Sequence, residues 1–259
     1  MGFDEDFLGE RMPLPAAPGD SITLDYEHFT VEQSVERRLA FYAAVNIDGS
    51  ALVELERGDD WRLDERAGDA QLGPELYARN DLDRGHLVRR RDPVWGPREV
   101  ARRANSDTFH YTNAAPQAAG FNQSKELWLG LEDHILEHAR RYDGRLSVIT
   151  GPVFADGDPL YRGALLPRRF FKVAAWHDGS GLAATAYLLD QSTLLAGLGL
   201  RQALPPLGGF RTFQVPVAEI AELTGLAMPE LTAADRLVPA GVRPGAGWRE
   251  LTSYADVAL

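Results

Sequence analysis

The chain has 259 residues, a formal net charge of −11 and no cysteine. Its 44 % hydrophobic and 25 % charged residues are typical of a globular protein. No stretch approaches the roughly 20 apolar residues that a membrane-spanning helix needs. The absence of cysteine excludes disulfides, thiolate catalysis and thiolate metal sites, so any metal must be held by nitrogen and oxygen ligands.

The charge is unevenly distributed along the chain. Residues 1–66 carry sixteen acidic and six basic side chains, a balance of −10, whereas the remainder is close to neutral. Within that remainder, residues 84–103 contain seven arginines against Asp92 and Glu99, a balance of +5. This arginine-rich window is either a cationic patch for a polyanion or a solvated face of the protein.

The N-terminal half predicts a peripheral arm followed by strands. Residues 1–21 are rich in proline and acids and are expected to form the arm. They lack the basic and apolar regions of a secretory signal, so we expect residence in the cytoplasm or export by a signal-independent route. Residues 22–50 indicate an early antiparallel element that ends at a turn, residues 51–56 a further strand, and residues 57–75 a surface loop.

The C-terminal half predicts helices around a central sheet. Leucine and isoleucine recur every four residues in 124–142, which is typical of an amphipathic helix. The apolar runs at 146–154, 170–176 and 182–190 are expected to be strands, and 217–225 a last helix that stops at Gly225. With no repeat and no linker, residues 22–259 are expected to form one domain.

One tetrapeptide carries the clearest functional signal. Asp83-Arg84-Gly85-His86 resembles the signature of the DNA/RNA non-specific endonucleases, a family of ββα-metal nucleases. The resemblance continues in DTFHYTNAAPQAAGFNQSKELWLGLE at 107–132 and extends over roughly residues 22–230. It implies an α+β fold with a central, mainly antiparallel sheet flanked by helices, and a metal-dependent endonuclease that cleaves both DNA and RNA.

Phosphodiester hydrolysis needs an activated water, a cation beside the developing charge and a proton for the leaving oxygen. An imidazole, with its ordinary pKa near 6.5, suits the first task, and the resemblance implies that His86 is the general base. It also implies that Asn122 holds Mg²⁺, or Mn²⁺ or another divalent cation, through its amide oxygen. Asn122 is also suited to be the N-cap of the helix that starts near residue 124.

Further residues follow from the resemblance. Glu132 matches an acidic residue that binds metal-coordinated water, and Asn113 matches a site asparagine whose alternative role is in a turn. Arg84 is expected to bind phosphate or to pair with Asp83.

Three more arginines are candidates for substrate binding. Arg37 and Arg38 lie where the family has an arginine near the scissile phosphate, and Arg89 belongs to the arginine-rich window. The sequence does not choose between Arg37 and Arg38.

The sequence departs from the family pattern at Leu136, where an arginine is usual, with Arg140 or Arg141 as substitutes from the next turn. His134 and His138, four residues apart, and His110 are rival metal ligands.

Two other functions stay open: a catalytically weakened nucleic-acid-binding homologue, and an effector of a defence or toxin system that needs a partner. The expected partners are the DNA and RNA backbone, an inhibitor or regulatory protein, and a second copy in a homodimer, with no membrane.

Overall fold

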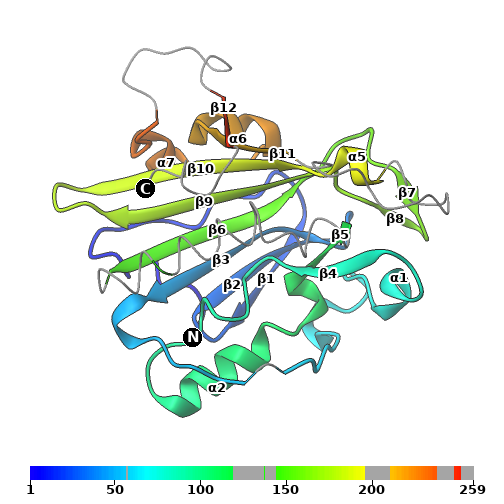
Figure 1. Cartoon of the computed structure of the whole chain (residues 1–259), viewed down its shortest axis with the longest axis horizontal. Coiled ribbons are helices and arrows are strands. Elements are labelled where there is room, and N and C mark those ends of the chain that lie inside the picture. Colours follow the sequence, from blue (N-terminus) through cyan, green and yellow to red (C-terminus); the bar gives the residue numbers. More distant parts are fainter. Residues whose placement is uncertain (57, 119–136, 138–143, 196–210, 238–247, 252–259) are drawn as a thin grey trace.

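An antiparallel sheet of eight strands organises the protein (Figure 1). The structure is a computed structural model that describes residues 1–56, 58–118, 137, 144–195, 211–237 and 248–251. Neighbouring strands of the sheet all run antiparallel. In spatial order the strands are β1 (Ser21–Tyr26), β2 (Phe29–Ser34), β3 (Ala40–Asp48), β6 (Arg145–Val153), β9 (Arg169–His177), β10 (Leu182–Asp190), β11 (Arg211–Val215) and β12 (Arg249–Leu251).

Both faces of this sheet are buried, which explains why its central strands are almost continuously apolar. In β9, Phe170 and Ala174 point into one core, whereas Phe171 and Val173 point into the other, as the two-residue period of a strand requires. The strands expected at 146–154, 170–176 and 182–190 are thereby confirmed, and so is the expected α+β architecture with its mainly antiparallel sheet.

One face of the sheet is covered by the N-terminal segment together with α6 (Val217–Thr224) and α7 (Pro229–Ala233). The expected last helix is confirmed, and Gly225 follows it with a φ of 71°, a left-handed conformation that glycine adopts without strain. None of the described helices is long and apolar enough to span a membrane.

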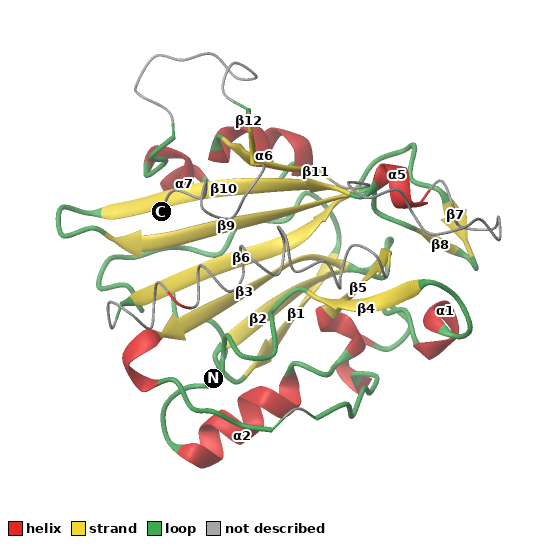
Figure 2. Cartoon of the chain, in the orientation of Figure 1, coloured by secondary structure: helices red, strands yellow, loops and turns green. Residues whose placement is uncertain are grey.

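The opposite face carries a second, two-stranded sheet formed by β4 (Leu82–His86) and β5 (Ala114–Ala118). Helix α1 (Pro74–Tyr77) contacts β4, and the 3-10 helix Tyr111–Asn113 contacts β5. The 3-10 helix Gly49–Ala51 contacts β6, the 3-10 helix Glu65–Ala67 contacts β1, and α2 spans Arg98–Asp107. Figure 2 shows α2 and the β4–β5 pair on the same side of the large sheet. Short elements β7 (Leu160–Tyr161), β8 (Ala164–Leu165) and α5 (Ser192–Leu195) complete the described fold.

The structure differs from the sequence expectations at two elements, and a third expected element lies largely outside the described residues. The strand predicted at 51–56 is wrong: a 3-10 helix ends at Ala51, and only Leu52 makes an isolated bridge, with Trp95. Helix α2 was not predicted, because seven of its ten residues are charged or polar and gave little apolar periodicity. The helix predicted at 124–142 lies outside the described residues, apart from the helical residue Glu137.

The N-terminal arm contributes more to the core than its composition indicates. Phe7, Leu8 and Met12 are buried against the sheet, and Met12 is only 1 % exposed. Ala16 forms a bridge with Ala227, with N–H···O distances of 3.0 and 3.1 Å in the two directions. Three separated apolar residues in an acidic segment give no regular period, so the sequence pattern did not reveal this packing.

We expect Met12→Ala to lower the free energy of unfolding by about 2–5 kcal/mol, because it leaves a cavity in a packed core. Urea denaturation monitored by circular dichroism measures the change. Leu160→Ala is the control, since Leu160 is 72 % exposed. Equal stability of the Met12 variant and the control would show that the arm does not belong to the core.

Candidate active site on the β4–β5 ribbon

The signature tetrapeptide lies on strand β4 and not in a turn. His86 pairs with Ala114 and Leu82 with Ala118 in the antiparallel β4–β5 ribbon. Because side chains of a strand alternate between its faces, Arg84 and His86 share one face and Asp83 and Gly85 the other. The ribbon therefore places the expected general base and an arginine side by side.

Aromatic rings surround His86. The imidazole centroid lies 4.7 Å from the ring of Trp61 and 5.3 Å from the ring of Phe109, which it meets edge-on. The Nε2 atom is buried. These contacts restrict the rotation of the imidazole and keep bulk water from its flanks.

Asn113, an expected catalytic residue, is fully buried and bound to the main chain. Its Oδ1 accepts a hydrogen bond from the N–H of Val88 at 2.8 Å, and its Nδ2 donates to the carbonyl oxygens of Val88 and Thr108 at 2.9 and 3.0 Å. The main-chain N–H of Leu87 also donates to the carbonyl oxygen of Asn113 at 2.9 Å. These bonds fix the chain directly after His86.

A buried network supports the residue before Asn113. Thr112 shares a 2.6 Å hydrogen bond with the hydroxyl of Tyr26, which donates to Asp64 at 2.6 Å. Burial opposes ionisation of Asp64, but hydrogen bonds from Arg66 and Tyr26 outweigh it, so the pKa of Asp64 lies below its usual range. The charged carboxylate thus anchors the loop that carries Asn113.

Gly85 permits a close approach of Gln117. A Cβ atom at position 85 would lie 2.1 Å from Cδ and 2.6 Å from Cγ of Gln117, so only glycine fits under this side chain. Gln117 is 1 % exposed, and among the described residues neither atom of its amide has a hydrogen-bond partner. The glycine of the tetrapeptide is therefore a packing requirement of the ribbon.

Arg84 lies over the ring of Trp61, with Cζ 5.1 Å from the ring centroid. Its Nη2 is also 3.7 Å from a carboxylate oxygen of Asp59, whose side chain is 69 % exposed. Asp83, the alternative partner considered from the sequence, points to the other face of the strand. The Arg84 side chain is 36 % exposed, so it is accessible to a phosphate.

Most of the arginine-rich window is engaged with acidic or polar groups of the protein. Arg91 pairs with Glu54 at 3.0 Å, Arg102 with Glu99 at 2.6 Å and Arg103 with Glu27 at 3.1 Å. Arg90 donates to the carbonyl oxygen of Leu55 and to Asn105. The window is therefore less cationic than its sequence balance of +5 indicates.

Arg37 and Arg38, the expected contacts near the scissile phosphate, both have partners within the protein. Arg37 forms an ion pair with the buried Asp158 and lies over the ring of Phe154, with Cζ 4.4 Å from its centroid. Arg38 adopts a positive φ of 55° and donates to the carbonyl oxygen of Gly163 at 2.6 Å. Both side chains thus make structural contacts with the 154–163 region.

The expected metal ligands Asn122 and Glu132 lie outside the described residues, and so do His134, His138, Leu136, Arg140 and Arg141. Within the described parts of the chain, no group of three or more His, Asp or Glu residues is positioned to hold a metal.

His110, the remaining rival ligand, packs against Tyr26 at 4.9 Å and hydrogen-bonds the carbonyl oxygen of Asp107 through Nδ1. Burial lowers the pKa of His110. Its contacts are those of a structural histidine.

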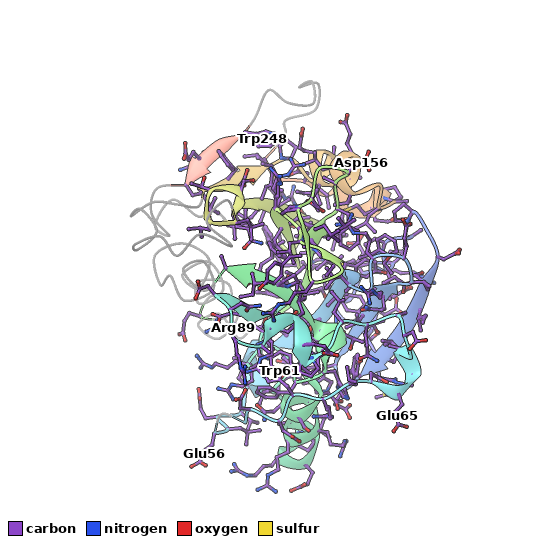
Figure 3. The ribbon with its side chains drawn as sticks, turned by 90° about the vertical axis from the view of Figure 1, so that its right-hand side faces the viewer. Glu56, Trp61, Glu65, Arg89, Asp156 and Trp248 are labelled. Atoms are coloured by element: carbon purple, nitrogen blue, oxygen red, sulfur yellow. The ribbon has the colours of Figure 1, made fainter. Side chains whose placement is uncertain are left out.

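Trp61 is the site residue that sequence reasoning missed. It lies in the polar segment interpreted as a surface loop, where an isolated aromatic residue has no periodic partners. Figure 3 shows Glu56 and Glu65 extending from the periphery, whereas Trp61 lies further inside. A single tryptophan among acidic and glycine residues was the available signal that part of this loop is packed.

Comparisons with known proteins agree on a nuclease fold. A family model described as DNA/RNA non-specific endonuclease matches residues 13–235. In a crystal structure of the EndoG/EndoGI complex, one chain superimposes with a TM-score of 0.60 at 18 % identity, covering 83 % of this chain and 88 % of that one.

Two curated relatives extend the similarity. An uncharacterized protein of Sinorhizobium fredii, y4fB, is 39 % identical over 99 % of this chain, which spans only 42 % of that relative's length. A nuclease of Nostoc is 26 % identical over 80 % of this chain and 72 % of its own length.

We expect Gly85→Ala to reduce stability by about 1–3 kcal/mol, because the added methyl group overlaps Gln117. Adding Gln117→Ala to this variant is expected to restore most of the loss. Urea denaturation of the single and double variants measures both effects. Gly157→Ala is the control, because a Cβ there meets nothing within 4 Å; the same stability for Gly85→Ala and this control would contradict the packing argument.

Proposed function

Because the chain belongs to the family of DNA/RNA non-specific endonucleases, we propose that it hydrolyses phosphodiester bonds in both DNA and RNA with His86 as the general base. The observation that carries this proposal is that the side chains of His86 and Arg84 lie on the same face of the β4–β5 ribbon. This arrangement sets a proton acceptor beside a cation that binds phosphate.

His86 supplies the proton acceptor. A neutral imidazole removes a proton from the attacking water as the oxygen approaches phosphorus, and the rings of Trp61 and Phe109 fix its direction. We assign Asn113 a positioning role, because its amide is used by Val88 and Thr108 and it sets the path of the chain after His86.

Substrate binding is assigned to Arg84 and to Arg89, three residues beyond His86. A guanidinium presents two parallel N–H groups to phosphate oxygens. Such contacts suit a nucleic acid that is recognised through its phosphates and not through its bases. Arg37 and Arg38 are assigned structural roles because Asp158 and Gly163 engage them. The described site includes no element that reads base edges, which fits cleavage without base specificity.

The family is divalent-metal-dependent, and we propose Mg²⁺ for this member. Asn122 would hold the ion through its amide oxygen, and Glu132 would bind through its carboxylate or through water. An oxygen donor set of this kind suits a hard cation that keeps several waters. When bound, the ion stabilises charge on the phosphate and supplies an acidic water for the leaving oxygen.

A regulated form of this activity is the second candidate. The structure of the EndoG/EndoGI complex concerns inhibition of EndoG, and a cell that contains a non-specific nuclease needs a restraint. The Sinorhizobium relative is more than twice as long as this chain, which fits a nuclease that works as one part of a larger protein. We propose an inhibitor or partner protein, and an effector role in defence, as the alternative to a free enzyme.

We expect His86→Ala to lower the rate of cleavage of plasmid DNA and of RNA by about 10²–10⁴-fold, because it removes the general base. Agarose gels and release of acid-soluble nucleotides, with Mg²⁺ or with EDTA, measure the reaction. His177→Ala is the matched control, because His177 is exposed at the end of β9. Asn122→Ala is expected to be as inactive as the EDTA sample.

Normal turnover of His86→Ala would overturn the assignment of the base, and normal turnover of Asn122→Ala that of the metal ligand. Gel retardation without cleavage by the wild type would favour a binding protein. Cleavage that the wild type shows only after a partner protein is added would favour the effector function.

A further inference from the structure

We propose that Trp61 is a positioning residue that holds His86 and Arg84 in one working geometry, so that base and phosphate-binding cation stay aligned. The inference rests on the proposed nuclease function and deepens it by assigning a residue outside the signature tetrapeptide. It is carried by the contacts of the Trp61 ring with the side chains of both His86 and Arg84.

Trp61 contacts the imidazole directly. The two ring centroids are 4.7 Å apart with an interplanar angle of 48°, so the indole lies against His86 as a tilted wall. An imidazole on a strand rotates about two side-chain bonds, and a large rigid ring removes much of this freedom. Trp61 thereby orients the nitrogen that accepts the proton.

The same indole also binds the guanidinium of Arg84. Its Cζ lies 5.1 Å from the ring centroid, within the range of a cation–π interaction. Asp59 competes for this cation at 3.7 Å from Nη2. Because the indole attracts the guanidinium without supplying a hydrogen-bond acceptor, it leaves the N–H groups of Arg84 available for phosphate.

Trp61 is itself well fixed. The neighbouring residue, Arg62, donates its N–H to the carbonyl oxygen of Phe109 at 3.0 Å and accepts from the N–H of Tyr111 at 3.0 Å. The indole also packs edge-on against Phe109 at 5.5 Å and tilted against Tyr111 at 5.6 Å. The loop is thus attached to the segment that leads into β5, so Trp61 can transmit this rigidity to both functional side chains.

The test compares Trp61→Ala, Trp61→Phe and Trp95→Ala in steady-state cleavage of a fluorescent oligonucleotide, with rates normalised to folded protein. Trp95 is a matched control because it stacks on another histidine, His28, at 3.5 Å and away from the ribbon. Trp61→Ala is expected to lower kcat by about a hundredfold, the scale of a misplaced catalytic group. It is also expected to raise KM, because Asp59 then captures Arg84.

Trp61→Phe retains an aromatic wall and is expected to recover kcat to within about threefold of wild type, which a purely structural loss would not predict. Folded Trp61→Ala with kcat and KM within twofold of wild type would overturn the proposal. So would equal losses of kcat in Trp61→Ala and Trp61→Phe. If Trp61→Ala does not fold, Trp61→Leu takes its place as the variant without an aromatic ring. Equal kcat values for Trp61→Leu and Trp61→Phe would then overturn the proposal.

A readout without catalysis separates this inference from the proposed function. The ring current of Trp61 is expected to shift the imidazole protons of His86 in the NMR spectrum, with His86→Gln as the assignment control. Trp61→Ala is expected to remove this shift and to leave the signals of His28 unchanged. Trp95→Ala is expected to change the signals of His28 and to leave those of His86 unchanged. An unchanged His86 signal in Trp61→Ala would contradict the contact, whether or not the wild type cleaves nucleic acid.

Discussion

The alternation of side chains along β4 is the constraint on which the site depends. One face of this strand carries Arg84 and His86, and the other carries Gly85, whose missing Cβ allows Gln117 to lie across the ribbon. A shift of one residue in register would exchange the two faces. The arrangement is therefore maintained by packing on the side opposite to the chemistry, and Asn113 fixes the chain where the strand ends.

The protein uses much of its positive charge for its own structure. Arginines of the 84–103 window bind Glu27, Glu54 and Glu99, and Arg37 neutralises the buried Asp158. With a net charge of −11, long-range attraction of a polyanion is weak, and contact with phosphate depends on groups close to the ribbon. Under the proposed function, local geometry rather than overall charge accounts for recognition of a nucleic-acid backbone.

Sequence patterns revealed the elements that have a local signal, such as a run of apolar residues or a glycine that ends a helix. The apolar runs of β6, β9 and β10 and the glycine-terminated α6 were predictable because each has a simple period or stop signal. The tetrapeptide identified the family. By contrast, the packing of Trp61 and the pairing of Arg37 with Asp158 join residues far apart in sequence, and no local pattern encodes such contacts. Asn113 was singled out from the sequence as a site residue, but its hydrogen bonds with the main chain of Val88 and Thr108 could not be derived from its neighbours.

The most direct test of the account is a crystal structure with a divalent ion and a non-hydrolysable oligonucleotide. We expect the ion to bind Asn122 and one phosphate to contact both the ion and Arg84, with the imidazole of His86 facing the phosphorus. An ion held by other residues, or a phosphate bound away from the face that carries His86, would contradict it.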